Sequence, residues 1–214
     1  MGRLQPVIAA IPLFAGLDGR DQTRLCEGAR TQRAEAGEVI LERGGPAEAL
    51  YGVATGKLKV VTPRDGGRDS TLHILGPGDV FGEVAFFHPE GRTARITALE
   101  ESVLVVLDRR EFLDLLGRSP AFSQRLLALM AKRLHDTIAH FDATTSLDVP
   151  QRLARKLLLL LEGFGTPTAD GVGLKLKLSQ SELGELIDTT RQTVNRQLKL
   201  FADAGILRSE GGQL

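Results

Sequence analysis

The strongest constraint on the fold is a change of hydrophobic period near residue 108. Between residues 36 and 107, short β-branched runs alternate with glycine-rich turns, a pattern typical of an all-β barrel or sandwich. The expected strands are 38–41, 50–53, 57–61, 70–75, 95–99 and 103–107. The expected turns are 44–46, 65–67 and 76–79, with Asp65-Gly66 as the best hairpin tip. Beyond residue 108 the apolar spacing becomes helical, so the pattern predicts an α+β chain with its β-structure first.

A long helix is expected from about residue 121 to 141, after a short helix over 111–116 and a break over 117–120. Its apolar side chains recur at spacings of three and four and comprise Phe122, Leu126, Leu129, Met130, Leu134, Ile138 and Phe141. One interpretation is a helix packed on its own barrel. A helix of about 20 residues is about 30 Å long, however, and would extend beyond a small barrel. We therefore expect part of the stripe to pair with a second subunit, in a homodimer.

The composition excludes several classes of protein. With 214 residues, 42% of them hydrophobic, the chain suits one large or two small domains. Lys+Arg and Asp+Glu are both 27, so any contact with nucleic acid has to come from a local patch. Cys26 is the only cysteine, which excludes an intrachain disulfide, a cysteine-ligated iron–sulfur cluster and a cysteine zinc site. A reducing cytoplasm is the expected location, and no run approaches the roughly 20 apolar residues of a membrane span.

No catalytic or metal site is expected, and no tightly bound cofactor. His73, His88, His135 and His140 share no metal-ligand spacing, which favours scattered surface or core histidines. The sequence contains no recognisable nucleophile motif or poised carboxylate pair. The protein is therefore not expected to be an enzyme.

The last third of the chain has the pattern of a winged helix-turn-helix. Asp148 and Pro150 begin a helix that runs to about residue 162. A glycine-rich loop over 163–173 and an alternating strand over 174–178 are expected next. Two short helices follow: Ser179 caps the first, and Thr190 caps the second, which runs over 191–204. After Gly205, residues 206–208 form an expected wing strand, and a second wing strand would be expected after it.

The second short helix has the features of a DNA-reading helix. Residues 190–199 contain three cations and no acid. Side chains near its N-terminal end lie on one face, where Arg191 suits guanine and Gln192 suits adenine in the major groove. The candidate base and phosphate contacts are Ser179, Thr190, Arg191, Gln192, Thr193, Asn195, Arg196 and Lys199. A solvated helix face explains the same charges, and spacing alone does not separate the two interpretations.

Two motifs, over residues 178–200 and residues 78–94, resemble those of the cyclic-AMP receptor protein family, the CRP/FNR regulators. Residues 178–200, with Glu-Leu-Gly followed by Thr-Arg-x-Thr-Val-x-Arg, closely resemble the family's helix-turn-helix. Residues 78–94, Gly-Asp-Val-Phe-Gly-Glu-Val-Ala-Phe-Phe-His-Pro-Glu-Gly-Arg-Thr-Ala, resemble the phosphate-binding cassette of the cyclic-nucleotide-binding fold. The resemblance extends from about residue 11 to 207. It implies a jelly-roll-like β-roll sensor domain over 1–118, a dimerisation helix over 119–142 and a winged helix-turn-helix over 143–214.

The cassette suits a phosphate-bearing ligand. Gly82 lets the backbone approach an anion, Arg92 offers a charged fork and Thr93 a hydroxyl. A buried Glu83 requires a partner, and the resemblance implies a ribose 2′-hydroxyl. With two residues of the long helix that the resemblance adds, the candidate effector site is Gly82, Glu83, Val84, Arg92, Thr93, Arg133 and Thr137. The alternative is a structural salt bridge between Glu83 and Arg92 beside an empty pocket.

One departure from the family pattern affects effector choice. The base-contacting Thr of the family is followed by Ser, whereas Ile138 follows Thr137 here. The sequence therefore does not select adenine, and cyclic AMP, cyclic GMP and another nucleotide are all candidate effectors.

These features predict a dimeric, sequence-specific transcription regulator under allosteric control. Its expected partners are a near-palindromic double-stranded DNA site, a second copy of the chain and RNA polymerase, with no membrane partner. A ligand-independent regulator with a vestigial pocket is the alternative. A regulatory subunit of an enzyme or channel is disfavoured, because the DNA-reading features of the helix over 190–199 would then have no function.

Overall fold

The computed structural model describes residues 5–63, 69–169, 171–174 and 176–208. The chain forms two compact units, one comprising Met1–Arg68 with Leu72–His135 and the other Asp69–Thr71 with Asp136–Leu214. The predicted hairpin tip at Asp65-Gly66 lies outside the described residues. The expected order of a β-roll, a long helix and a helix-turn-helix is confirmed.

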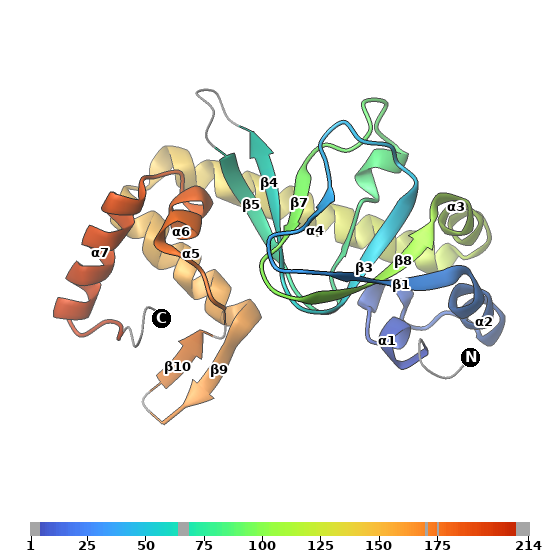
Figure 1. The fold of residues 1–214 in the computed structure, drawn as a ribbon, viewed down its shortest axis with the longest axis horizontal. Helices are drawn as coiled ribbons and strands as arrows, with labels where there is room; N and C mark the ends of the chain where they lie inside the picture. Colours follow the sequence, from blue (N-terminus) through green and yellow to red (C-terminus); the bar gives the residue numbers. More distant parts are fainter. Residues whose placement is uncertain (1–4, 64–68, 170, 175, 209–214) are drawn as a thin grey trace. The chain divides into compact units, whose positions relative to one another are not determined.

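The first unit is built on two four-stranded sheets (Figure 1). One has the order β1 (Ala29–Ala34), β8 (Ser102–Asp108), β3 (Ala49–Thr55) and β6 (Val80–Phe81). The other has the order β2 (Val39–Leu41), β7 (Arg95–Ala98), β4 (Leu58–Pro63) and β5 (Asp69–Leu75). Val53 and Leu104 from the first sheet share one buried cluster with Leu58 and Ile96 from the second, so the sheets pack face to face.

All six strands predicted between residues 36 and 107 are present, with ends shifted by one or two residues. Two further strands were not predicted. Strand β1 has an exposed polar centre, Thr31-Gln32-Arg33, and becomes a strand because it pairs along β8. Strand β6 has only two residues, too few for any periodic pattern.

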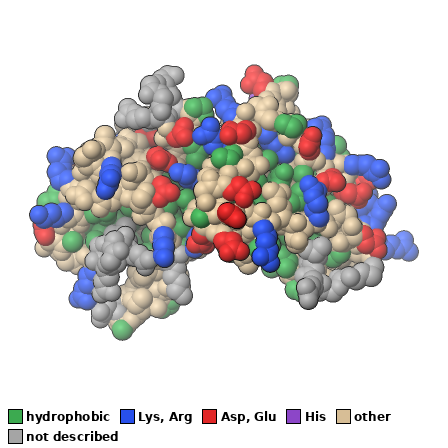
Figure 2. Space-filling model, in the orientation of Figure 1, with side chains coloured by type: hydrophobic (Ala, Val, Ile, Leu, Met, Phe, Trp, Pro, Cys, Tyr) green, Lys and Arg blue, Asp and Glu red, His purple; other side chains and the backbone are tan. Residues whose placement is uncertain are grey.

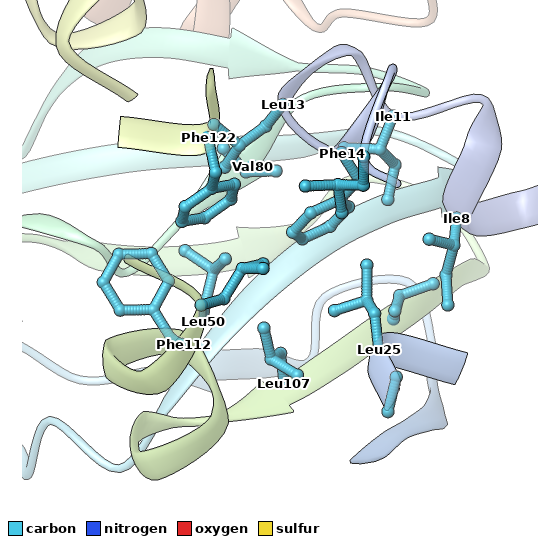
Figure 3. Close-up of a cluster of buried hydrophobic side chains, with 14 of the residues drawn as sticks. Ile8, Ile11, Leu13, Phe14, Leu25, Leu50, Val80, Leu107, Phe112 and Phe122 are labelled. Atoms are coloured by element: carbon cyan, nitrogen blue, oxygen red, sulfur yellow. The ribbon is translucent and has the colours of Figure 1, made fainter. Parts of the chain in front are cut away.

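Aromatic side chains from distant segments form the core at one end of the roll (Figure 3). Phe14 comes from the turn of 3-10 helix η1 (Pro12–Phe14), which follows α1 (Gln5–Ala9) and precedes α2 (Gly19–Gly28). Its ring stacks on Phe122 at 6.0 Å, and Phe112 of α3 (Arg109–Arg118) meets Phe122 edge-on at 5.6 Å. All three rings are buried, so removing one would cost about 3–5 kcal/mol. The core therefore anchors the start of the next helix.

That helix, α4, runs over Pro120–Ser146 for 27 residues and extends at both ends beyond the predicted range. Pro120 occupies its first position, where the missing N–H costs nothing. Phe122 and Leu126 are buried in the core just described. The later apolar residues are exposed in the single chain: Leu127 by 68%, Leu134 by 63%, Ile138 by 53% and Phe141 by 66%. Only the beginning of the predicted stripe is thus covered by the chain itself.

The second unit contains helix α5 (Val149–Phe164), a hairpin of β9 (Gly165–Thr168) and β10 (Gly171–Leu174), and helices α6 (Gln180–Leu186) and α7 (Arg191–Asp203) (Figure 1). The predicted caps are present: the side chains of Asp148, Ser179 and Thr190 each accept a hydrogen bond from a backbone N–H in the first turn. Helices α5 and α6 also have the second half of a capping box, in which the side chain of Gln151 or Glu182 accepts a hydrogen bond from the backbone N–H of the cap residue.

Three predictions for this unit were wrong. Where a loop was expected over 163–173, α5 continues to Phe164, and residues 165–168 and 171–174 pair as a two-stranded hairpin whose backbone groups hydrogen-bond across the strands. Of the strand expected over 174–178, Leu174 ends β10 and residues 176–178 are not in a strand, although Leu174 and Leu176 are both buried; residue 175 lies outside the described residues. Residues 206–208 form no strand, since no neighbouring strand pairs with them among the described residues. None of the described helices has the length and apolar character that a membrane span requires.

Candidate functional site

The cassette begins where β6 ends, at Gly82. Its φ is +94°, in the left-handed region that favours glycine. A Cβ added there would lie 2.5 Å from Nη1 of Arg92 and 3.2 Å from the carbonyl oxygen of Ala49. Gly82 is therefore required both by its backbone conformation and by the guanidinium packed against it.

Arg92 is buried, with only 4% of its surface exposed. Its Nε donates to the carbonyl oxygen of Pro46 at 3.1 Å. Its Nη1 donates to the carbonyl of Gly82 at 2.6 Å, and its Nη2 to the carbonyl of Ala49 at 2.8 Å. Burial lowers the pKa of Arg92 from its ordinary value, and the charges of nearby groups, among them Glu83, oppose that shift. Arg92 thus fastens residues 46–49 to Gly82, a structural role that the sequence did not indicate.

Glu83 is fully buried. Its Oε1 forms an ion pair with Nη1 of Arg133 on α4, and Nη2 of Arg133 donates to the carbonyl of Val80. Its other oxygen, Oε2, has no hydrogen-bond partner among the residues that the structure describes. The ion pair of Glu83 is therefore with Arg133 and not with Arg92, unlike the salt bridge considered from the sequence. A buried acceptor without a donor costs about 1–3 kcal/mol, and more when charged, so any group that donated a hydrogen bond to Oε2 would be stabilising.

The remaining predicted effector residues are less enclosed. Val84 begins the 3-10 helix η2 (Val84–Phe86) and is half-buried. Thr93 follows Arg92 and is exposed. Thr137 is exposed on α4, in the part of that helix that belongs to the second unit.

The helix-turn-helix is held together by close backbone packing between α6 and α7. A Cβ added to Gly184 would lie 2.8 Å from the carbonyl oxygen of Thr189, so only glycine allows this approach. Leu183, Leu186 and Val194 are buried beneath the two helices.

Helix α7 separates a buried face from an exposed one. Val194 and Gln197 are buried. The predicted contacts on the opposite face are exposed and comprise Arg191, Gln192, Asn195, Arg196 and Lys199. Charges of both signs are interspersed over the face of the molecule in Figure 2, in keeping with equal totals of acids and bases. The candidate nucleic-acid surface is therefore local to α7.

The hydroxyl and amide groups beside α7 are already in use within the protein. Ser179 Oγ accepts from the N–H of Glu182 and donates to its Oε2, so this hydroxyl serves as a cap. Thr190 Oγ1 accepts from the N–H of Thr193 at 3.2 Å. Asn195 Nδ2 donates to Oε1 of Gln180 at 3.0 Å. Gln180 was not among the predicted residues, because the contact joins positions 15 apart and depends on how the helices pack.

Comparison with known proteins agrees with this geometry. Residues 31–119 match the family model of the cyclic nucleotide-binding domain, and residues 151–214 match that of the Crp-like helix-turn-helix domain. The chain is 31% identical over 208 residues to the CRP-like cAMP-activated global transcriptional regulator of Mycobacterium tuberculosis, covering 97% of this chain and 93% of that protein. It is 32% identical over 197 residues to the cyclic AMP receptor protein of Thermus thermophilus, covering 92% of this chain and 88% of that protein.

A solved structure shows the same fold. FixK2 from Bradyrhizobium japonicum superposes with a TM-score of 0.77 at 23% identity, covering 86% of this chain and 90% of that one. A cyclic-nucleotide-binding β-roll followed by a helix-turn-helix defines a DNA-binding transcription regulator. The Mycobacterium tuberculosis relative is a transcriptional regulator, which points to a role other than catalysis. The chain belongs to the CRP/FNR family.

Proposed function

We propose that the protein is a dimeric, sequence-specific regulator whose DNA binding is controlled by cyclic AMP or cyclic GMP. The observation that carries this proposal is the buried Oε2 of Glu83, an acceptor in the cassette to which no described residue donates. A ribose 2′-hydroxyl would supply that donor. The nucleotide would thereby remove the cost of an unsatisfied buried carboxylate oxygen.

The phosphate of the nucleotide would bind beside Gly82, Arg92 and Thr93. Arg92 is a permanent cation with N–H groups on three nitrogens, and a phosphate would compete for them with the backbone carbonyls that accept them now. Two relatives are named for cyclic AMP, which supports that nucleotide. Ile138 next to Thr137 keeps cyclic GMP as a candidate.

The DNA contacts would come from the exposed face of α7. Arg191, Gln192, Asn195 and Arg196 would meet base edges, while Lys199 and the hydroxyls at the helix start would meet phosphates. The exposed apolar residues of α4 would pair with those of a second copy in the cytoplasm. Two-fold symmetry then requires a near-palindromic site with half-sites about 34 Å apart. A dimer bound at such a site would be able to contact RNA polymerase.

Calorimetric titration with each nucleotide, followed by DNA-affinity measurement with and without it, tests the proposal. We expect one nucleotide to bind and to raise affinity for a selected site by about 5- to 150-fold, the usual size of allosteric coupling. Specific DNA binding that neither nucleotide alters would favour a ligand-independent regulator with a vestigial pocket. Footprints confined to a single half-site would contradict the dimer.

A further inference from the structure

The turn between α6 and α7 has an unusual backbone conformation at Asp188. Its φ is +56°, and among the described residues it is the only non-glycine with a positive φ. A residue with a Cβ is disfavoured in this left-handed region, where glycine would fit without strain. We therefore expect the aspartate side chain to make contacts that glycine at this position could not make.

The carboxylate of Asp188 is almost completely enclosed, with 6% of its side chain exposed. Oδ1 accepts a hydrogen bond from Ser70 Oγ at 3.0 Å. Oδ2 lies 3.8 Å from Nε2 of His140 on α4. Residue 70 is grouped with this unit of the chain, so all these contacts are internal to it.

A half-buried cation, Lys156 on α5, interacts electrostatically with the same carboxylate. Burial lowers the pKa of Lys156 on α5, and the charge of Asp188 is the largest influence that raises it again. Asp136 on α4 also raises this pKa, and Arg155 lowers it. Of the two acids that raise the pKa of Lys156, Asp188 thus has the larger effect.

We infer that Asp188 is a positioning residue for the recognition helix. Its carboxylate ties the turn that precedes α7 to Ser70 by a hydrogen bond and lies against His140 of α4. The inference rests on the proposed role of α7 in reading DNA.

The position of Asp188 in the chain explains the effect. It lies two residues before Thr190, the cap of α7, so a shift of the turn moves the start of α7, where Arg191 and Gln192 stand. His140 lies on α4 between Ile138 and Phe141, two residues of the exposed apolar stripe. The same carboxylate thus connects the proposed dimer helix with the proposed DNA-reading helix.

The decisive variant is Asp188→Gly, measured in the full-length protein. Glycine adopts a positive φ without strain. If Asp188 had a purely structural role, this change would leave the stability of the protein unchanged or raise it. If Asp188 positions the recognition helix, the variant protein should bind DNA more weakly although it remains folded. We expect affinity for a site selected by the wild type to fall by about 3- to 30-fold, as is usual for contacts within one network.

Asp188→Asn, Lys156→Met and the double variant complete the test. Their effects on DNA affinity, measured by fluorescence anisotropy, should be non-additive, with the double variant close to the worse single variant. Asp203→Asn, the same change at an exposed position at the end of α7, is the matched control. Loss of a negative charge should by itself strengthen, not weaken, binding to a polyanion. A loss of DNA affinity that occurs only in the Asp188 variants therefore has the opposite sign to the general electrostatic effect.

The outcomes separate this inference from the proposed function. Equal affinities for wild type, Asp188→Gly and Asp203→Asn would overturn the positioning role and leave the regulator intact. A change in unfolding free energy alone would also overturn it. A wild type that selects no DNA sequence would overturn the proposed function, and the inference with it.

Discussion

Replacing Arg92 by alanine tests whether the cassette arginine supports the fold as well as the ligand. The change removes three charge-assisted hydrogen bonds, to the carbonyls of Pro46, Gly82 and Ala49. Pro46 is exposed and Gly82 half-buried, so water can reach their carbonyls in the variant. Ala49 is buried, and its carbonyl would lose its donor without replacement.

The magnitude follows from these differences. An unsatisfied buried acceptor costs about 2 kcal/mol, and each of the two bonds that water can replace contributes about 0.5–1 kcal/mol. We therefore expect Arg92→Ala to lower the free energy of unfolding of the first unit by about 3–4 kcal/mol. Arg95→Ala is the matched control, because Arg95 is 44% exposed and pairs with Glu42 at the surface. That variant should lose less than about 1 kcal/mol.

Urea denaturation followed by circular dichroism provides the measurement, since the chain has no tryptophan. Adding nucleotide at about 100 times its dissociation constant should stabilise the wild type by about 2.7 kcal/mol. Arg92→Ala should lose most of this gain. Equal unfolding free energies for Arg92→Ala and Arg95→Ala would refute the structural reasoning, and a full nucleotide gain in Arg92→Ala would place the effector elsewhere.

Three further predictions concern the effector, the dimer and the DNA. Glu83→Gln keeps an acceptor for the ribose hydroxyl but removes its charge, so nucleotide affinity should fall about tenfold by calorimetry; unchanged affinity would exclude this contact. Leu134→Glu should shift the protein to monomer in analytical ultracentrifugation while changing monomer stability by less than about 0.5 kcal/mol, and an intact dimer would exclude this stripe as the interface. Gln192→Glu should move base preference from adenine towards cytosine by about 1–3 kcal/mol in selection from random DNA, and identical selected sites would contradict a base contact.

The sequence by itself determined the local structure of this protein. Each predicted strand and helix of the first 164 residues is present, since period-two and period-3.6 patterns state which face of an element is buried. The helix caps at Asp148, Ser179 and Thr190 were equally readable, because a cap and its N–H partner are only two or three residues apart. Recognition of the family was possible for the same reason, since both motifs are continuous in the chain.

Tertiary structure decided what depends on contacts between distant residues. Strand β1 exists because it pairs with β8, whereas the predicted wing strand at 206–208 finds no pairing strand in the described part of the chain. The bonds of Arg92 to three carbonyls, the burial of Glu83 against Arg133 and the enclosure of Asp188 leave no trace in spacing or composition. Burial and hydrogen bonding are set by what the fold brings alongside a residue, whereas a sequence pattern records only its neighbours along the chain.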